Sequence, residues 1–271
     1  MSELTLSEIN VFPIKSLRGI SLPQADLTSR GLRLDRRWML VDDQGKFLSQ
    51  RVHPVLTMLQ VKIQGDQLEV HHVDYPEQVI EVSPNGPFES TIDVIVWQNI
   101  CSANVYPKPV NEWFSKRTGI DCRLVYMPDS SRRPVDSEYQ INEDIVSFAD
   151  GFPCLIIGES SLADLNGRLE NPVSMSRFRS NLVFSGGPAF AEDVWQEIRI
   201  GQVLFHVAKP CPRCVMITID PLTGQKGVEP MQTLATYRKD ATGGVMFGQN
   251  LLHSRPGTLQ VGMEIEVISR K

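Results

Sequence analysis

Most regular segments of the chain alternate apolar and polar residues with a period of two, and short polar loops, most containing glycine, separate them. This period is typical of strands with one buried face, and the loops are short enough to join neighbouring strands as hairpins. The candidate hairpins lie at residues 38–48, 59–70 and 198–205. The pattern therefore predicts a mainly antiparallel β protein whose strands close into a barrel.

Three shorter segments predict accessory helices, so the expected fold class is mainly β with helices added (α+β). Ser161 and Asp164 have the spacing of a capping box at the start of a helix that reaches residue 169. Residues 111–116 form a second candidate, which Asn111 caps and Gly119 ends. A third starts at Pro230.

Two further segments are expected to form strands on the same period-two argument. Residues 259–267 place apolar side chains at every second position, which predicts one half-buried strand near the C-terminus. The apolar run 215–219 follows a cysteine pair and also predicts a strand.

The chain has 271 residues, about 1.8 times the length of an average domain of ~150 residues, which suits one large domain or two closely packed ones. Prolines 107 and 109 and the helix after them place the domain boundary near residue 118, which gives domains at 1–118 and 119–271. The net charge of −5 gives no general attraction to nucleic acid or to an anionic membrane. No apolar run approaches the ~20 residues that cross a bilayer.

The cysteines and the first residues indicate a reducing, cytoplasmic location. Five cysteines are an odd number for a disulfide framework, and they are spread along the whole chain. Two acidic residues precede the first apolar stretch, so the start lacks the pattern of a signal peptide.

One segment, Lys209-Pro-Cys-Pro-Arg-Cys214, concentrates reactive side chains, and four interpretations remain open for its cysteines. The pair could be half of a zinc site, although no second pair exists and the histidines are scattered. It could be a redox dithiol, although that motif belongs at a helix start after a βαβ pattern. The cysteines could also be strand residues without chemistry. Finally, one thiolate could ligate a soft transition metal, with Lys209 and Arg213 lowering its pKa and attracting an anionic cofactor.

Basic residues at other strand ends favour the metal interpretation. Lys15 and Ser16 follow a short strand, Arg36 precedes another, and Arg179 and Asn181 precede a third. An ammonium, hydroxyls and guanidinium groups of this kind would bind a phosphate if the strand ends meet. The Rossmann, phosphate-loop, nucleophile-elbow and zincin motifs are all missing from the sequence.

Six short segments match, in order, the motifs of one known family, and together they span nearly the whole chain. They are residues 13–16, 31–38, 161–166, 178–183, 209–214 and 247–250. On these segments the sequence resembles the MOSC superfamily of molybdenum cofactor sulfurase C-terminal domain proteins. Within it, the chain is similar to the YcbX-like branch, which is related to the mitochondrial amidoxime reducing component. The resemblance implies an N-terminal MOSC-type β-barrel domain packed on a C-terminal MOSC β-barrel domain, with a molybdenum-pterin cofactor between them.

The resemblance also implies roles for single residues. Cys214 matches the cysteine that ligates molybdenum, and Cys211 matches one that is not a ligand. Asp150 matches an acidic position near the metal and is the candidate for proton delivery, although a loop or helix-capping aspartate would look the same. The residues that match cofactor-binding positions are Lys15, Ser16, Arg36, Arg179, Asn181 and Arg213. Pro212 departs from the family, because relatives have a small polar residue there and proline lacks an N–H donor.

The expected activity is the molybdenum-dependent reduction of N-hydroxylated compounds, such as amidoximes, hydroxylamines and N-hydroxylated bases, to amines or amidines with release of water. Many relatives continue into an iron–sulfur domain, whereas this sequence ends at Lys271. Electrons are therefore expected from a separate protein, a flavin reductase or a ferredoxin-like donor. The alternative is a binding protein that carries the molybdenum cofactor, or a sulfurated form of it, without turnover.

Overall fold

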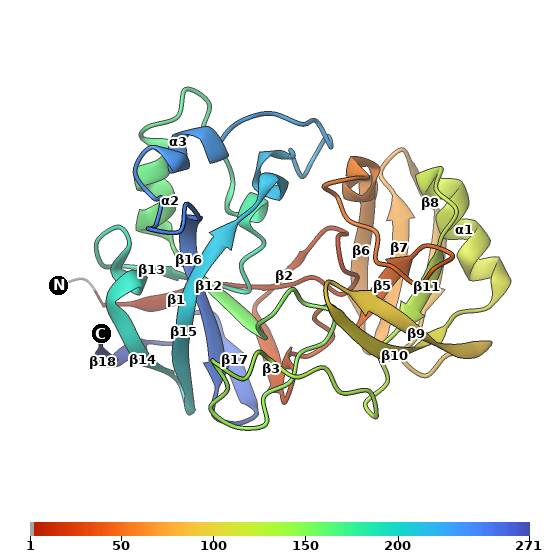
Figure 1. Ribbon diagram of the computed structural model, residues 1–271, viewed down its shortest axis with the longest axis horizontal. Coiled ribbons are helices and arrows are strands. Elements are labelled where there is room, and N and C mark those ends of the chain that lie inside the picture. The colour runs from red at the N-terminus through yellow and green to blue at the C-terminus, as the bar shows by residue number, and fades with distance from the viewer. Residues whose placement is uncertain (1–2) are drawn as a thin grey trace.

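The computed structural model describes residues 3–271, so residues 1 and 2 of the predicted N-terminal domain and start segment lie outside it. Two lobes lie side by side (Figure 1), which we call the large and the small lobe. The large lobe is built on an eight-stranded sheet and a three-stranded sheet, and the small lobe on a four-stranded and a three-stranded sheet. The predicted mainly β fold with accessory helices is therefore confirmed, whereas closure of the sheets into barrels stays a prediction.

The eight-stranded sheet of the large lobe contains both the first and the last strand of the chain. Its spatial order is β18 (Ile265–Arg270), β14 (Trp195–Ile200), β15 (Val203–Arg213), β16 (Val245–His253), β12 (Cys154–Gly158), β13 (Leu182–Ser185), β1 (Thr5–Val11) and β2 (Ile20–Leu22). A second sheet has the order β17 (Gly257–Gln260), β3 (Gln24–Thr28) and β4 (Gly31–Leu32). The pairs in the described chain are antiparallel except for β12 with β13. The core of this lobe packs around Trp195, Phe184 and Phe205, which are fully buried.

The small lobe holds the strands between β4 and the middle of the chain. One sheet has the order β5 (Trp38–Val41), β11 (Arg123–Tyr126), β10 (Asn99–Val105) and β9 (Ser90–Val96), and the other β6 (Leu59–Gln64), β7 (Gln67–His72) and β8 (Tyr75–Val82). In its core the indole Nε1 of Trp38 donates to the hydroxyl of Tyr106 at 2.8 Å. Because β1 to β4 pair with large-lobe strands, the chain crosses between the lobes early. The domain boundary near residue 118 stays a prediction.

The helices are short and lie at the outside of the sheets (Figure 1). They are α1 (Lys108–Thr118), α2 (Glu159–Asn166), α3 (Met231–Ala235) and the 3-10 helices η1 (Pro54–Met58), η2 (Met175–Phe178), η3 (Ala191–Val194) and η4 (Val215–Thr218). All three predicted α-helices are confirmed, and Gly119 ends α1 in a left-handed conformation. The predicted caps are wrong: Asn111 instead lies inside α1 and bonds to Tyr106 and Leu124, and Ser161 lies inside α2 and donates to Glu192. No helix among residues 3–271 is long and apolar enough to cross a bilayer.

The predicted hairpins at 59–70 and 198–205 are confirmed as β6–β7 and β14–β15. In the third predicted hairpin, residues 38–41 form β5, whereas residues 46 and 47 of the second arm form single bridges and no strand. The single strand predicted at 259–267 is wrong. Gly262 has a φ of 93°, which divides the segment into β17 and β18 in different sheets. The strand predicted at 215–219 is also wrong, because β15 ends before the second cysteine and residues 215–218 form η4.

A long segment without regular structure, residues 127–153, connects the lobes and is held from inside by Arg133. This side chain is 3% exposed, and its Nη1 donates to the carbonyl oxygens of Ser147 (2.9 Å) and Ala149, while Nη2 donates to that of Asp150 (2.8 Å). Its Nε donates to the amide oxygen of Asn99 at 3.0 Å, which ties the segment to β10. One buried guanidinium thus fixes the backbone that carries Asp150.

We expect Arg133→Met to lower the free energy of unfolding by about 2–4 kcal/mol, because two buried carbonyl groups and one partly buried one would lose their donor. Urea denaturation followed by circular dichroism measures this change. The matched control is Arg132→Met, since Arg132 is 61% exposed and within residues 3–271 pairs only with Glu143. That control should cost about 0.5 kcal/mol or less. Equal losses in the two variants would contradict the anchoring role of Arg133.

Candidate cofactor and active site

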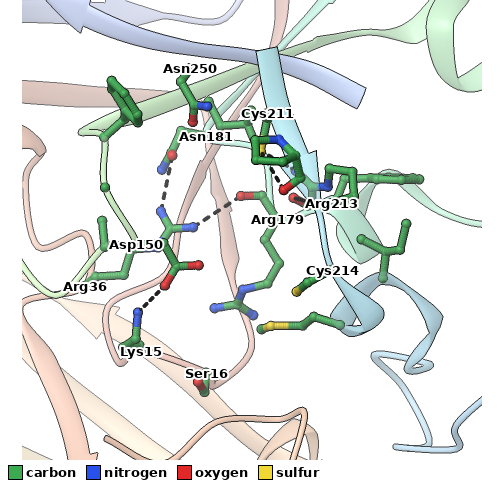
Figure 2. Close-up of a pocket in the computed structure, with 18 of the residues that line it drawn as sticks. Lys15, Ser16, Arg36, Asp150, Arg179, Asn181, Cys211, Arg213, Cys214 and Asn250 are labelled. Carbon is green, nitrogen blue, oxygen red and sulfur yellow. Dashed lines mark hydrogen bonds and ion pairs between the residues drawn. The ribbon is translucent and has the colours of Figure 1, made fainter. Parts of the chain in front are cut away.

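The residues predicted for the site come together in one pocket between the two lobes. The pocket holds about 850 Å³ of space, part of it open to solvent. Its lining includes every predicted site residue: Lys15, Ser16, Arg36, Asp150, Arg179, Asn181, Arg213 and Cys214. These side chains come from segments that are far apart in the sequence, and Figure 2 shows how they face a common space. The structure thus places the residues together, and their individual roles stay predictions.

The pocket is strongly basic, although the protein is acidic overall. Its lining contains six basic side chains and one acidic one. The six are Lys15, Arg36, Arg51, Arg177, Arg179 and Arg213. Like charges crowded in a partly desolvated space repel one another, so a bound anion would be stabilised here.

Lys15 and Asp150 form an ion pair at one wall of this central pocket. The buried Nζ of Lys15 donates to Asp150 Oδ1 at 2.6 Å and to the carbonyl oxygen of Phe148 at 2.8 Å. Trp97 Nε1 donates to the same Asp150 oxygen at 3.0 Å. Burial lowers the pKa of Lys15 to about 8, although the carboxylate opposes this change.

The pKa of Asp150 is held well below its usual range. Burial alone would raise it, but the charge and hydrogen bond of Lys15 have the larger combined effect. With 66% of its side chain exposed, Asp150 stays ionised and accessible at neutral pH. An ionised carboxylate accepts protons poorly at this pKa, so of this pair the Lys15 ammonium is the group that exchanges a proton near neutral pH.

The guanidinium groups of Arg36 and Arg179 both lie over the ring of Phe12. Their guanidinium carbons lie 4.5 Å and 4.3 Å from the centre of the Phe12 ring. Arg36 pairs with Asp35, and it donates to Asn181 Oδ1 and to the carbonyl oxygen of Arg179, both at 3.2 Å. These bonds fix the Arg36 plane across the boundary of the lobes.

Arg179 carries a charge that no carboxylate in the described chain pairs with. Its Nη1 donates to the carbonyl oxygen of Leu17 at 2.7 Å. Burial lowers the pKa of Arg179 to about 9, and the neighbouring charge of Arg36 adds to this effect while Asp35 opposes it. Figure 2 shows this guanidinium reaching into the same space as the sulfur of Cys214.

Three lining residues adopt backbone conformations that side chains usually avoid. The φ angles are 69° at Ser16, 49° at Arg36 and 53° at Arg179. A left-handed conformation costs a residue with a side chain roughly 1–2 kcal/mol and is concentrated at functional sites. The fold therefore holds these three cofactor-binding candidates in fixed, unfavourable backbone positions.

The two cysteines of the Cys-x-x-Cys segment differ in their surroundings, and both are free thiols. Cys211, in β15, accepts a hydrogen bond from Arg213 Nη1 at 3.0 Å, and Nη2 of the same arginine donates to the carbonyl oxygen of Phe178. Cys214 follows the strand, is exposed, and has no hydrogen-bond partner for its sulfur within residues 3–271. Both cysteines line the pocket, and Cys214 is the more exposed of the two and the one whose sulfur is free to bind a ligand there.

Lys209, which was expected to act on the thiolate, instead lies 4.5 Å from the ring of Tyr139 and 5.4 Å from that of Phe152. The zinc interpretation finds no ligand set, since residues 3–271 contain no group of three or more His, Cys, Asp or Glu side chains that could hold a metal. A metal bound by Cys214 alone would need further donors from a cofactor.

The donor set fits a compact anionic cofactor that brings its own metal ligands. One accessible thiol and the guanidinium groups of Arg179 and Arg213, which pair with no carboxylate in the described chain, are what a pterin dithiolene with a phosphate would use, and the buried Nε of Arg213 has no partner there either. No motif pointed to Phe47, Arg51 and Trp97: Phe47 forms a single β-bridge with Val41, and the other two lie in turns. Phe12 immediately precedes the predicted Lys15 segment, and its aromatic ring was the available signal.

Two family models match most of the chain. A model described as the MOSC N-terminal beta barrel domain matches residues 3–121, and one described as the MOSC domain matches residues 143–266. Among curated proteins, mitochondrial amidoxime-reducing component 1 of Mus musculus is 30% identical, over 98% of this chain and 83% of its own length. Mitochondrial amidoxime reducing component 2 of Bos taurus is 32% identical, over 86% of this chain and 72% of its own length.

A molybdenum cofactor sulfurase of Oryza sativa subsp. japonica is 32% identical over 92% of this chain, which covers only 32% of the sulfurase. The similarity to the amidoxime-reducing components therefore extends over most of both proteins, and that to the sulfurase over one part of it. The chain belongs to the family of proteins in which a MOSC N-terminal beta barrel domain precedes a MOSC domain, and it is a distant homologue of the mitochondrial amidoxime-reducing components.

Proposed function

We propose that the protein is a molybdenum-cofactor-dependent reductase of N-hydroxylated compounds that receives electrons from a separate protein. The observation that carries this proposal is the accessible, unpartnered thiol of Cys214 at a pocket lined by six basic side chains. The names of its amidoxime-reducing relatives support the substrate class. In the overall reaction the N–O bond breaks, two electrons and two protons are taken up, and an amine or amidine and water are released.

Different residues of the pocket would bind different parts of the cofactor. The Cys214 thiolate would be the protein ligand of molybdenum, and Arg36, Arg179 and Arg213 would bind the anionic parts of the pterin. When bound, the cofactor supplies a two-electron centre that accepts oxygen from the substrate. Pro212 also lines the pocket, and it provides neither an N–H nor a side-chain donor.

The Lys15–Asp150 pair provides a proton-exchanging group at the pocket wall. We propose that the Lys15 ammonium, supported by Asp150, neutralises the phosphate end of the cofactor or passes protons toward the departing oxygen. In both roles Asp150 acts by keeping Lys15 charged. The electron donor, a flavin- or ferredoxin-type protein, would approach the open side of the pocket.

We expect Cys214→Ser to abolish molybdenum binding and the conversion of benzamidoxime to benzamidine, because the hydroxyl is a poor ligand for a soft metal. Cys211→Ser should retain most of both, since Cys211 faces Arg213. Metal analysis of protein expressed with molybdate, followed by assay with reduced methyl viologen, measures the two properties. Unchanged molybdenum in Cys214→Ser would disprove the proposal, and cofactor transfer without conversion in the wild type would favour the carrier function.

Cofactor binding should weaken as the pH rises, and we expect this weakening to begin at a lower pH in Asp150→Asn than in the wild type. In the wild type, binding should weaken as the pH rises through about 8, where Lys15 loses its charge. Without the carboxylate, the pKa of Lys15 should fall further, by about one pH unit or more. Uptake of the cofactor by apoprotein, measured between pH 6 and 9, tests this order. Asp129→Asn is the control, because Asp129 pairs with Arg37 outside the pocket, and it should leave the profile unchanged.

We expect Arg179→Met to weaken cofactor binding while leaving the unfolding free energy of the apoprotein unchanged or higher. The variant removes a buried charge that has no carboxylate partner, so no ion pair is lost. Arg177→Met is the matched comparison, since Arg177 pairs with Asp220 at 3.0 Å and its removal leaves that carboxylate unpaired. Arg177→Met should therefore destabilise the apoprotein. Denaturation of both apoproteins, with cofactor titration, separates the two effects.

A further inference from the structure

Arg51 lines the central pocket but has no anionic partner. It lies in the turn between the residue 46–47 bridges and η1, and its side chain is partly buried. Within residues 3–271 its guanidinium forms no ion pair or hydrogen bond, whereas Arg37, Arg177 and Arg238 each pair with an aspartate. A positioned guanidinium without an anion can recognise one on a ligand.

Two aromatic rings hold the Arg51 side chain in place. Its guanidinium carbon lies 4.6 Å from the ring centre of Trp97 and 5.7 Å from that of Phe47. The two rings contact each other edge to face with 5.2 Å between their centres. Stacking uses the face of a guanidinium and leaves its N–H donors, which lie in its plane, free for an oxyanion.

Trp97 holds its indole beside Arg51 from a backbone conformation that residues with side chains usually avoid. Trp97 and Gln98 form the two-residue turn between β9 and β10, and Trp97 has a φ of 58°. Positive φ at the first residue only is typical of a type II′ turn, where glycine is usual. A bulky residue in this conformation is a true outlier, and such strain is concentrated at functional sites.

Trp97 in turn connects Arg51 to the residues of the pocket. Its Nε1 donates to Asp150 and its ring contacts Phe47, and both of these line the central pocket. The indole is also 49% exposed, so it lies at the pocket rim. Arg51 is thus presented at the rim by a rigid aromatic support.

Arg51 also lines a second, shallow hollow next to the pocket, which we call the outer groove. The groove is lined by Arg51, Val215, Thr218, Ile219, Lys226, Gly227, Val228, Met231 and Gln232. Within residues 3–271, Arg51 is the one basic residue that lines both hollows. The groove combines apolar side chains with the charges of Arg51 and Lys226, and no acidic residue lines it. Val215, which directly follows Cys214, places the groove beside the predicted metal ligand.

We propose that Arg51 and the outer groove form a substrate subsite that selects N-hydroxylated compounds with an apolar body and an oxyanion group. The oxyanion binds the free edge of the Arg51 guanidinium, the apolar part lies in the groove, and the N–O group reaches the central pocket. Trp97 is a positioning residue that keeps the guanidinium in place. This inference rests on the proposed reductase function for its substrate class.

The test compares two N-hydroxylated compounds that differ in one charge, benzamidoxime and 4-carboxybenzamidoxime. Molybdenum-loaded wild type and Arg51→Gln are assayed with reduced methyl viologen, so no partner protein is needed. We expect the wild type to prefer the carboxylate. Arg51→Gln should lower kcat/KM for it by roughly tenfold or more, mainly through KM, because a hydrogen bond to a charged group is lost. The neutral compound should change by less than about twofold.

Three further variants separate the subsite from general effects. Arg270→Gln removes one positive charge from β18, away from the pocket, and should change neither compound. Trp97→Ala should weaken the carboxylate compound through KM. Trp97→Phe should recover most of the lost activity on the carboxylate compound, because phenylalanine keeps an aromatic face for Arg51. It lacks the hydrogen bond to Asp150, so the recovery would show that the aromatic face is what positions Arg51.

Two results would overturn the proposal even if the protein is a reductase. Equal losses for both compounds in Arg51→Gln would mean that Arg51 does not select charge. Loss of molybdenum in Arg51→Gln would assign the residue to cofactor binding. If the loaded wild type reduces neither compound, the proposed function fails, and calorimetric binding of the carboxylate decides the subsite. The subsite is supported if the wild type binds 4-carboxybenzamidoxime more tightly than benzamidoxime and Arg51→Gln removes this difference. Equal binding of the two compounds by the wild type overturns it.

Discussion

The hydrogen bonds of Arg36, from its guanidinium and its backbone carbonyl, join the parts of the chain from which the pocket is built. Arg36 precedes the small-lobe strand β5, pairs with Asp35, and donates to Asn181 and to the carbonyl oxygen of Arg179 in the large lobe. Its own carbonyl oxygen accepts from the backbone N–H of Phe148, in the connecting segment that carries Asp150. Arg36 therefore connects three pocket walls, two through its flat guanidinium, which a flexible ammonium would do less well, and the third through its backbone carbonyl.

The same geometry explains why the pocket is costly to fold. Arg36 and Arg179 both lie over the Phe12 ring, and burial together with the neighbouring charge of Arg36 lowers the pKa of Arg179 to about 9. An aromatic ring in contact with both cations lessens this cost but does not remove it. A site that is unfavourable without an anion and favourable with one gives its ligand a stabilising effect on the whole fold.

The sequence predicted well what depends on short-range pattern. The period of two identified the hairpins β6–β7 and β14–β15, since a half-buried strand exposes every second side chain. It failed at residues 259–267, where Gly262 turns the chain without interrupting the alternation, and at 215–219, where a short apolar run fits a 3-10 helix as well as a strand. Periodicity carries no information on such turns.

The candidate site was predictable only where its residues lie in family motifs. Lys15, Arg36 and Cys214 were found in this way, and the structure brings them to one pocket. Arg51 and Trp97 were missed because each lies in a turn, and their significance depends on contacts between segments about 45 residues apart. Neither the contact of Arg51 with the Trp97 ring nor the positive φ of Trp97 can be inferred from residue composition or motif spacing.

The two prolines of the segment 209–214 help to explain why its two cysteines have different surroundings. Pro210 and Pro212 cannot donate to the ladder between β15 and β16, and the register of this pair shifts between them. The strand continues to Arg213, so Cys211 and Arg213 lie on one face two residues apart and form the Nη1–Sγ hydrogen bond. Cys214 comes directly after the strand, where no ladder constrains it, and its thiol stays accessible. Pro212, where the sequence departs from the family pattern, thus gives the β15–β16 ladder no N–H, and the strand ends one residue later, directly before the exposed Cys214.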